Sequence, residues 1–207
     1  MKKDSQGTEE KIIQAAEKIF IEKGYKRTST YDIAKEAGCN HALIHYYFRT
    51  KEHLFKKVFD EKVNMIMDII ESSITSGDLF SAMKTFIDKY YEFLEQNPKI
   101  PRFVINELLS DPDRLKQIKE TYYQNESRRK TFANVHHLIE QAVANRQIRE
   151  ISTVDFIMDV ISNSIFSFIA VPAYMNLSWG ADDQHAFLMH RKEEVYKLLC
   201  RGLLPDD

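Results

Sequence analysis

The chain has 207 residues, of which 43% are hydrophobic and 29% are charged. This composition supplies a core and indicates a folded, water-soluble protein. With only 6 Gly and 5 Pro there is little material for hairpins, which favours an all-helical fold. Two cysteines, Cys39 and Cys200, exclude a disulfide framework, and no zinc-binding spacing accompanies them. No metal or cofactor is expected.

The net charge of −2 conceals an asymmetry along the chain. Residues 1–57 carry 12 Lys and Arg against 8 Asp and Glu, and the remaining residues carry 17 against 23. A basic N-terminal segment followed by an acidic remainder is typical of a DNA-binding module joined to a domain that does not bind DNA. Solvated helices can give similar counts. The N-terminus is acidic and has no apolar run, so we expect no signal peptide and a cytoplasmic location.

The first predicted helix follows a loose tail, residues 1–7. From Thr8 onward, apolar residues recur at helical spacing until Gly24. They are Ile12, Ala15, Ala16, Ile19 and Phe20. This face should brace the segment that follows.

Residues 29–48 are predicted to form a helix, a tight turn and a second helix. Ser29 or Thr30 can cap the first helix, Gly38 can end it in a left-handed conformation, and Asn40 can cap the second. Small Ala34 and Ala37 allow the two helices to cross closely. This pattern is typical of a helix-turn-helix, whose second helix enters the DNA major groove.

The outward side chains of the second helix support this interpretation. His41, His45, Tyr46 and Tyr47 provide donors, acceptors and flat rings without negative charge, which suits base edges and phosphates. A plain helical hairpin with a solvated face is the alternative.

This region resembles the N-terminal signature of the TetR family of bacterial transcriptional regulators over roughly the first quarter of the chain. The matching residues are Gly24-Tyr25, Ser29-Thr30, Asp32-Ile33-Ala34, Ala37-Gly38, Ile44, Tyr47-Phe48 and Lys51-Glu52-x-Leu54. The family usually has Tyr where this chain has His45, and often Thr where it has Leu43. The resemblance implies a DNA-binding domain, residues 1–50, and a helical ligand-binding and dimerisation domain, residues 51–207.

Position and resemblance together predict the DNA contacts. These are Thr30, Tyr31, His41, His45, Tyr46, Tyr47 and Lys51. Lys51 follows the expected cap Thr50, where a cation opposes the helix macrodipole unless an external anion offsets it. We therefore expect Lys51 to contact a DNA phosphate, with a solvated lysine as the alternative.

Six further helices are predicted after Thr50. They cover residues 50–73, a segment after Asp78, residues 102–109, 113–145, 155–171 (stopped by Pro172) and 183–201. The resemblance implies that the first of these helices connects the DNA-binding domain to the ligand-binding and dimerisation domain.

The aromatic-rich body is predicted to contain a mainly apolar pocket with a few polar groups. The candidates for polar lining are Asn106, Tyr123, His137 and Asn163. Core packing explains most of the aromatic residues equally well. The resemblance implies a small-molecule inducer.

The last two helices are predicted to form the dimer interface as an isologous four-helix bundle. The candidates are Ile161, Ile165, Phe168, Leu188, Val195 and Leu199. Packing within the monomer is the alternative.

Residues 160–181 contain no charged residue, but their Ser, Asn and Pro content favours a buried or interface helix over a membrane span.

The sequence thus predicts an all-α protein of about nine helices. It would be a homodimeric, ligand-responsive transcriptional regulator, in the simplest case a repressor, that binds a near-palindromic DNA operator and is released by a small, largely apolar effector. The alternative is an all-helical carrier or sensor of apolar molecules without specific DNA binding. Nothing in the sequence resembles a catalytic motif, so we do not expect an enzyme.

Overall fold

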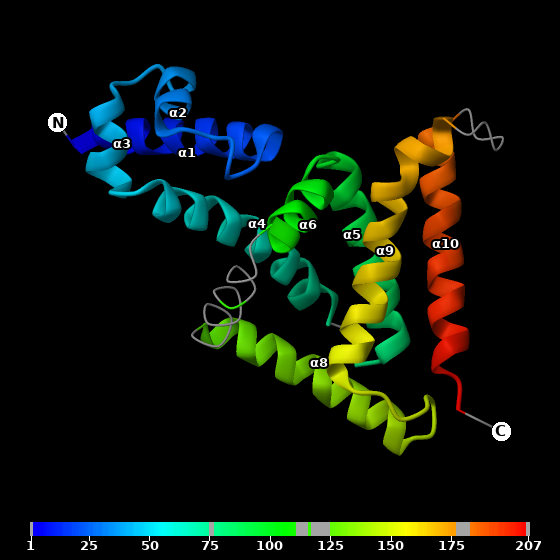
Figure 1. Cartoon of the computed structure of the whole chain (residues 1–207). Helices are drawn as coiled ribbons and strands as arrows, with labels where there is room; N and C mark the ends of the chain where they lie inside the picture. The colour runs from blue at the N-terminus through cyan, green and yellow to red at the C-terminus, as the bar shows by residue number, and fades with distance from the viewer. Residues whose placement is uncertain (1, 75–76, 111–115, 117–124, 177–182, 206–207) are drawn as a thin grey trace. The chain divides into compact units, whose positions relative to one another are not determined.

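The computed structural model describes residues 2–74, 77–110, 116, 125–176 and 183–205, and these residues contain helices and no strand. The helices, labelled in Figure 1, are α1 (Lys2–Lys23), α2 (Thr30–Glu36), α3 (His41–Phe48), α4 (Lys51–Ser73), α5 (Leu79–Gln96), α6 (Ile100–Ser110), α8 (Glu126–Ala144), α9 (Thr153–Asn176) and α10 (Gln184–Leu203). The prediction of an all-α chain is confirmed.

Polar caps define where several of these helices begin. Asn40 accepts a hydrogen bond from the backbone of Ala42, and Asp78 and Asp183 do the same for the first turns of α5 and α10. These side chains satisfy backbone N–H groups that have no partner inside the helix.

Three predicted helix boundaries are wrong. Helix α1 begins at Lys2, so residues 2–7 are no loose tail, because adding residues to a nucleated helix costs little. The helix expected over residues 113–145 begins at Glu126 after the cap Asn125, and its earlier part lies largely outside the described residues. Helix α9 continues through Pro172 to Asn176, because contacts such as that between the rings of Tyr174 and Phe187, 5.7 Å apart, support the turn beyond it.

The chain divides into two compact units. Unit 1 comprises residues 1–65 and 102–116, and unit 2 comprises residues 66–101 and 117–207. Unit 1 extends past the expected boundary at residue 50, because the rings of Phe55 and Phe59 in α4 and Phe103 in α6 join its aromatic core. The ring of Phe55 also lies 5.0 Å from those of Phe20 and Tyr25, so one cluster ties α1 and the loop after it to α4.

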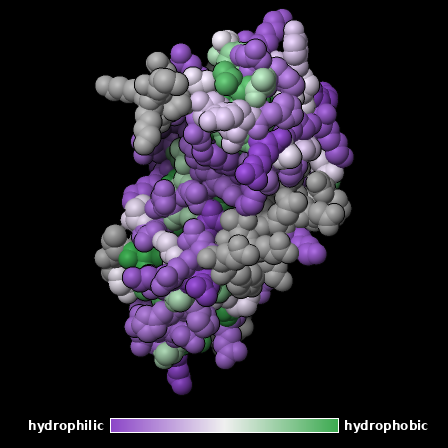
Figure 2. All heavy atoms as spheres, turned by 90° about the vertical axis from the view of Figure 1, so that its left-hand side faces the viewer, coloured by the Kyte–Doolittle hydropathy of each residue, from purple (hydrophilic) through white to green (hydrophobic). Residues whose placement is uncertain are grey.

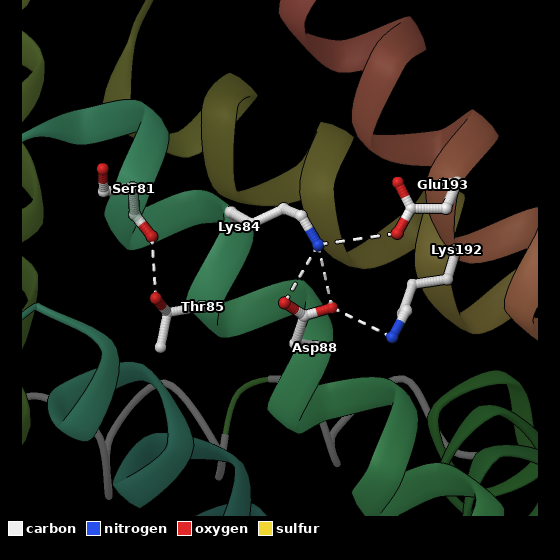
Figure 3. Close-up of polar contacts among 6 residues, drawn as sticks. All are labelled: Ser81, Lys84, Thr85, Asp88, Lys192 and Glu193. Carbon is white, nitrogen blue, oxygen red and sulfur yellow. Dashed lines mark hydrogen bonds and ion pairs between the residues drawn. The ribbon is translucent and has the colours of Figure 1, made fainter.

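Unit 2 is built on α5, which contacts α8, α9 and α10 (Figure 1). Its buried face includes Tyr90 and Tyr91, and the Tyr91 hydroxyl donates a hydrogen bond to the Ser167 hydroxyl of α9 at 3.0 Å. On its other side, Asp88 pairs with Lys84 in its own helix and with Lys192 of α10, each at 3.0 Å (Figure 3). Packing and ion pairs therefore fix α5, α9 and α10 as a three-helix core.

Burial corrects part of the expected dimer interface. Leu188, Val195 and Leu199 are buried within the chain, so they are core residues of unit 2. Helix α10 contacts both α5 and α9, and this packing takes up the apolar stripe that the sequence assigned to a partner. Ile161, Ile165 and Phe168 remain partly exposed.

The apolar residues that are most exposed to solvent on α9 and α10 are not those that the sequence assigned to the dimer interface. Val154, Met158 and Phe166 of α9 and Leu198 of α10 are each more than half exposed. The stretch Thr153–Val171 is long and apolar enough to cross a membrane by length and composition alone. In this structure the stretch packs against α5 and α10. The face shown in Figure 2 is mostly hydrophilic, with hydrophobic side chains in small groups.

Candidate nucleic-acid interface

Helices α2 and α3 form the helix-turn-helix that the sequence predicts. Ser29 caps α2 in a capping box with Asp32, and the hydrogen bonds from Ser29 hold the pKa of the Asp32 carboxyl below its ordinary value. Gly38 has a φ of +63°, a left-handed conformation that favours glycine, and it turns the chain toward α3. Buried Ile33 and Ile44 anchor the two helices, so their opposite faces remain at the surface.

The exposed face of this motif is rich in rings. Tyr31 is 69% exposed and Tyr46 is 77% exposed, although both are large side chains. The ring of Tyr46 lies edge-on to that of Tyr47, 5.1 Å away. Since α3 contains no acidic residue, this face presents aromatic and hydrogen-bonding groups without negative charge. Such a surface suits base edges and phosphates.

Thr30 and Tyr31 of α2 contact His41 of α3. The Thr30 hydroxyl lies 2.8 Å from Nε2 of His41, and the His41 ring lies 5.0 Å from that of His45. The Tyr31 ring lies 6.4 Å from that of His41. Six of the seven predicted DNA-contacting residues, Thr30, Tyr31, His41, His45, Tyr46 and Tyr47, thus lie on α2 and α3.

The seventh, Lys51, has a different environment. Its Nζ donates hydrogen bonds to the backbone carbonyls of Tyr25 at 3.1 Å and Thr28 at 2.9 Å. The same atom lies 4.0 Å from the centre of the Tyr25 ring, within cation–π range. Thr50 caps α4 as expected, accepting from the backbone of His53. Two of the three N–H donors of Lys51 are therefore used inside unit 1, where Lys51 holds the loop before α2, and its contact with a DNA phosphate stays a prediction.

Glu107 supports the same loop and was not predicted. This carboxylate is 5% exposed and accepts a hydrogen bond from the backbone N–H of Tyr25 at 2.8 Å. Gly24 has a φ of +76°, and a Cβ built there would lie 3.3 Å from Oε1 of Glu107. The contact joins residues 82 positions apart, so no local pattern could have indicated it.

A small apolar cavity lies in unit 2. It has a volume of about 50 Å³ between the end of α4 and helices α5, α8 and α9. Its walls include Ile70, Met83, Phe86, Leu138, Phe156 and Ile161. Ligand pockets usually measure about 300–1,000 Å³, so this cavity must widen to hold an effector.

Three of the four predicted polar residues do not line this cavity. Asn106 is exposed on α6, His137 is exposed on α8 and contacts Gln141, and Asn163 donates to the carbonyl of Asp159 in its own helix. Tyr123 lies outside the described residues. Among the residues that the structure describes, no group of three or more His, Cys, Asp and Glu could hold a metal ion.

Comparison with known proteins finds bacterial transcriptional regulators. The family described as bacterial regulatory proteins, tetR family, matches residues 12–58. The probable HTH-type transcriptional regulator YttP of Bacillus subtilis is 30% identical over 123 residues, 58% of this chain and 59% of that protein. The chain therefore matches less than two thirds of the length of this relative.

Two further comparisons extend over nearly the whole chain. The fatty acid metabolism regulator protein of B. subtilis is 24% identical over 195 residues, 93% of each chain. The structure of the fatty acid degradation regulator FadR from Bacillus halodurans superposes with a TM-score of 0.68 at 20% identity, covering 95% of this chain and 96% of that one. It has the same fold, and the family match over residues 12–58 identifies the helix-turn-helix segment as that of the TetR family of bacterial transcriptional regulators.

Proposed function

We propose that the protein is a cytoplasmic, homodimeric transcriptional regulator, most simply a repressor. It binds a near-palindromic DNA operator and is released by a small, largely apolar effector. Members of the family bind DNA and usually act as dimers with small-molecule effectors. The observation that carries the proposal is the exposed ring-rich face of α2 and α3.

The proposed reader consists of the six residues on α2 and α3 described above. In this proposal Tyr46 and His45 contact base edges, and Thr30 and Tyr47 contact phosphates. One helix-turn-helix of this size supplies little specific affinity for DNA. A dimer places two of them about 34–36 Å apart, or a multiple of that distance, and so reads two half-sites.

The proposed dimer interface uses the exposed residues of α9 and α10. Met158, Phe166 and Leu198 are apolar and solvent-exposed in the single chain, and the partly exposed Ile161, Ile165 and Phe168 lie on the same helix α9. Burying such side chains against a second copy is favourable by about 25 cal/mol per Å² of apolar surface.

The proposed effector carries an alkyl chain. The cavity in unit 2 is walled almost entirely by apolar atoms, so a charged group inside it would lose its hydration without compensation. Two relatives carry names that concern fatty acid metabolism or degradation. A fatty acyl chain in the cavity, with its polar end outside the apolar walls, satisfies both observations.

Binding of labelled duplexes tests the DNA-binding role. Duplexes from the intergenic DNA beside the gene should bind far more tightly than shuffled duplexes of equal length. The binding constant should fall steeply with salt, because phosphate contacts release counterions. Tyr46→Ala should weaken specific binding, and Tyr196→Ala in α10 serves as the aromatic control. Weak binding without sequence preference would instead support a carrier of apolar molecules.

Thermal unfolding with saturated fatty acids of increasing chain length tests the effector. The midpoint should rise with chain length, because a ligand that binds only the folded state stabilises it. Ala82→Val adds two methyl groups to the cavity wall and should raise the midpoint without ligand while abolishing the ligand-induced rise. Equal shifts for wild type and variant would place the effector elsewhere.

A further inference from the structure

His45 and Arg49 form two hydrogen bonds with each other at the end of α3. The backbone N–H of Arg49 donates to the carbonyl of His45 at 3.0 Å. Nδ1 of the His45 ring lies 3.1 Å from the carbonyl oxygen of Arg49. Arg49 has a φ of +60°, so the chain leaves the helix here and turns its carbonyl back toward the ring.

This second contact fixes the tautomer of the ring. A carbonyl oxygen can only accept, so Nδ1 of His45 must carry the hydrogen. Neutral imidazole has one ring N–H, which leaves Nε2 as a hydrogen-bond acceptor. Because the His45 side chain is exposed, this acceptor is available to a ligand.

The neighbouring groups leave this arrangement intact. His41 meets His45 with its ring nearly perpendicular, at an interplanar angle of 83°. On α2, Tyr31 contacts the His41 ring, and the two acids of that helix, Asp32 and Glu36, bond to Ser29 and Lys18. Arg49 itself is the C-cap residue of α3.

An acceptor in the major groove distinguishes two classes of base. Adenine and cytosine present amino donors there, whereas guanine and thymine present keto acceptors. We infer that His45 is a specificity-determining residue that selects an amino base, adenine or cytosine, at one position of each half-site, because Arg49 holds its ring with Nε2 as the acceptor. The inference rests on the proposed DNA-binding function.

Nitrogen-15 NMR of the full-length protein tests the tautomer directly. Long-range proton–nitrogen spectra at pH 8 distinguish the two neutral forms of each histidine. His45 should be in the Nδ1–H form, and an Nε2–H form would overturn the inference without any DNA present. His45→Gln assigns the signal.

Selection from a pool of randomised duplexes tests the base preference. The wild type at pH 7.5 should prefer an amino base over a keto base by about fivefold at one position of each half-site. His45→Lys offers only donors and should reverse the preference at that position. His45→Tyr can donate and accept, and should abolish it. His190→Lys in α10 adds the same charge and should select the wild-type bases.

Identical selected sequences for wild type and His45→Lys would overturn the base-reading role and leave DNA binding intact. Failure of the wild type to select any duplex would overturn both.

Discussion

Replacing Lys51 by Met separates a structural role from a DNA-contacting role. Methionine keeps most of the apolar stem, so the change removes mainly the ammonium group and its three N–H donors. In the structure two of those donors serve the carbonyls of Tyr25 and Thr28, in the loop that leads into α2 and α3. The substitution should therefore reduce stability and leave the number of phosphate contacts unchanged.

The expected loss follows from these contacts. A hydrogen bond from a charged donor contributes about 1.5–3 kcal/mol, but Lys51 is only half-buried, so about 1 kcal/mol for each bond is appropriate. The contact with the Tyr25 ring adds about 0.5 kcal/mol. Removing a cation from the first turn stabilises α4 by a few tenths of a kcal/mol, because the cation opposes the helix macrodipole. The free energy of unfolding should fall by about 2 kcal/mol.

Urea denaturation and salt-dependent DNA binding measure the two roles. Lys197→Met is the matched control, since Lys197 forms an exposed pair with Glu194 within α10 and should cost less than about 0.5 kcal/mol. For Lys51→Met, the slope of log K against log salt should equal that of the wild type. A slope lower by about 0.9 with unchanged stability would mean that Lys51 neutralises a phosphate, and the structural argument would be refuted.

Three further predictions follow from the described contacts. Gly24→Ala should destabilise the protein by about 1–2 kcal/mol in denaturation, more than Gly38→Ala, because both have positive φ but only Gly24 faces Glu107. Ser167→Ala should cost about 1–3 kcal/mol by leaving the buried Tyr91 hydroxyl without its partner, whereas Tyr91→Phe combined with Ser167→Ala should cost less than the sum of the single changes. The hydrogen bond to Glu95 raises the pKa of His185. The stabilisation that this bond gives the folded protein is complete below the pKa of an unfolded histidine and is lost as the pH rises through the raised pKa of the folded state. Glu95→Gln should therefore lower the NMR-measured pKa of His185 and remove that pH dependence of stability.

Local chemistry made much of the helical organisation predictable. Ser29 and Asn40 cap helices where their side chains suggested, because capping depends on residues two or three positions apart. The same holds for the turn at Gly38. The exposed faces of α2 and α3 were predictable because helical periodicity separates inward from outward positions.

The incorrect predictions depend on contacts between distant residues. Periodicity showed that Leu188 and Val195 share one face of a helix, but not whether that face meets the same chain or a second copy. Lys51 was correctly placed in the first turn of α4, yet nothing local reveals that two carbonyls from residues 25–28 converge on it. The buried carboxylate of Glu107 belongs to the same class.

Helix α4 connects the DNA reader to the cavity by covalent continuity. It runs without interruption from Lys51, which binds the loop before α2, to Ser73, which lines the cavity. Because the cavity of about 50 Å³ has to widen, an effector must bind the open state better than the closed one. That difference in affinity is the free energy available to move α4, so effectors that prefer the open state more strongly should release DNA more completely.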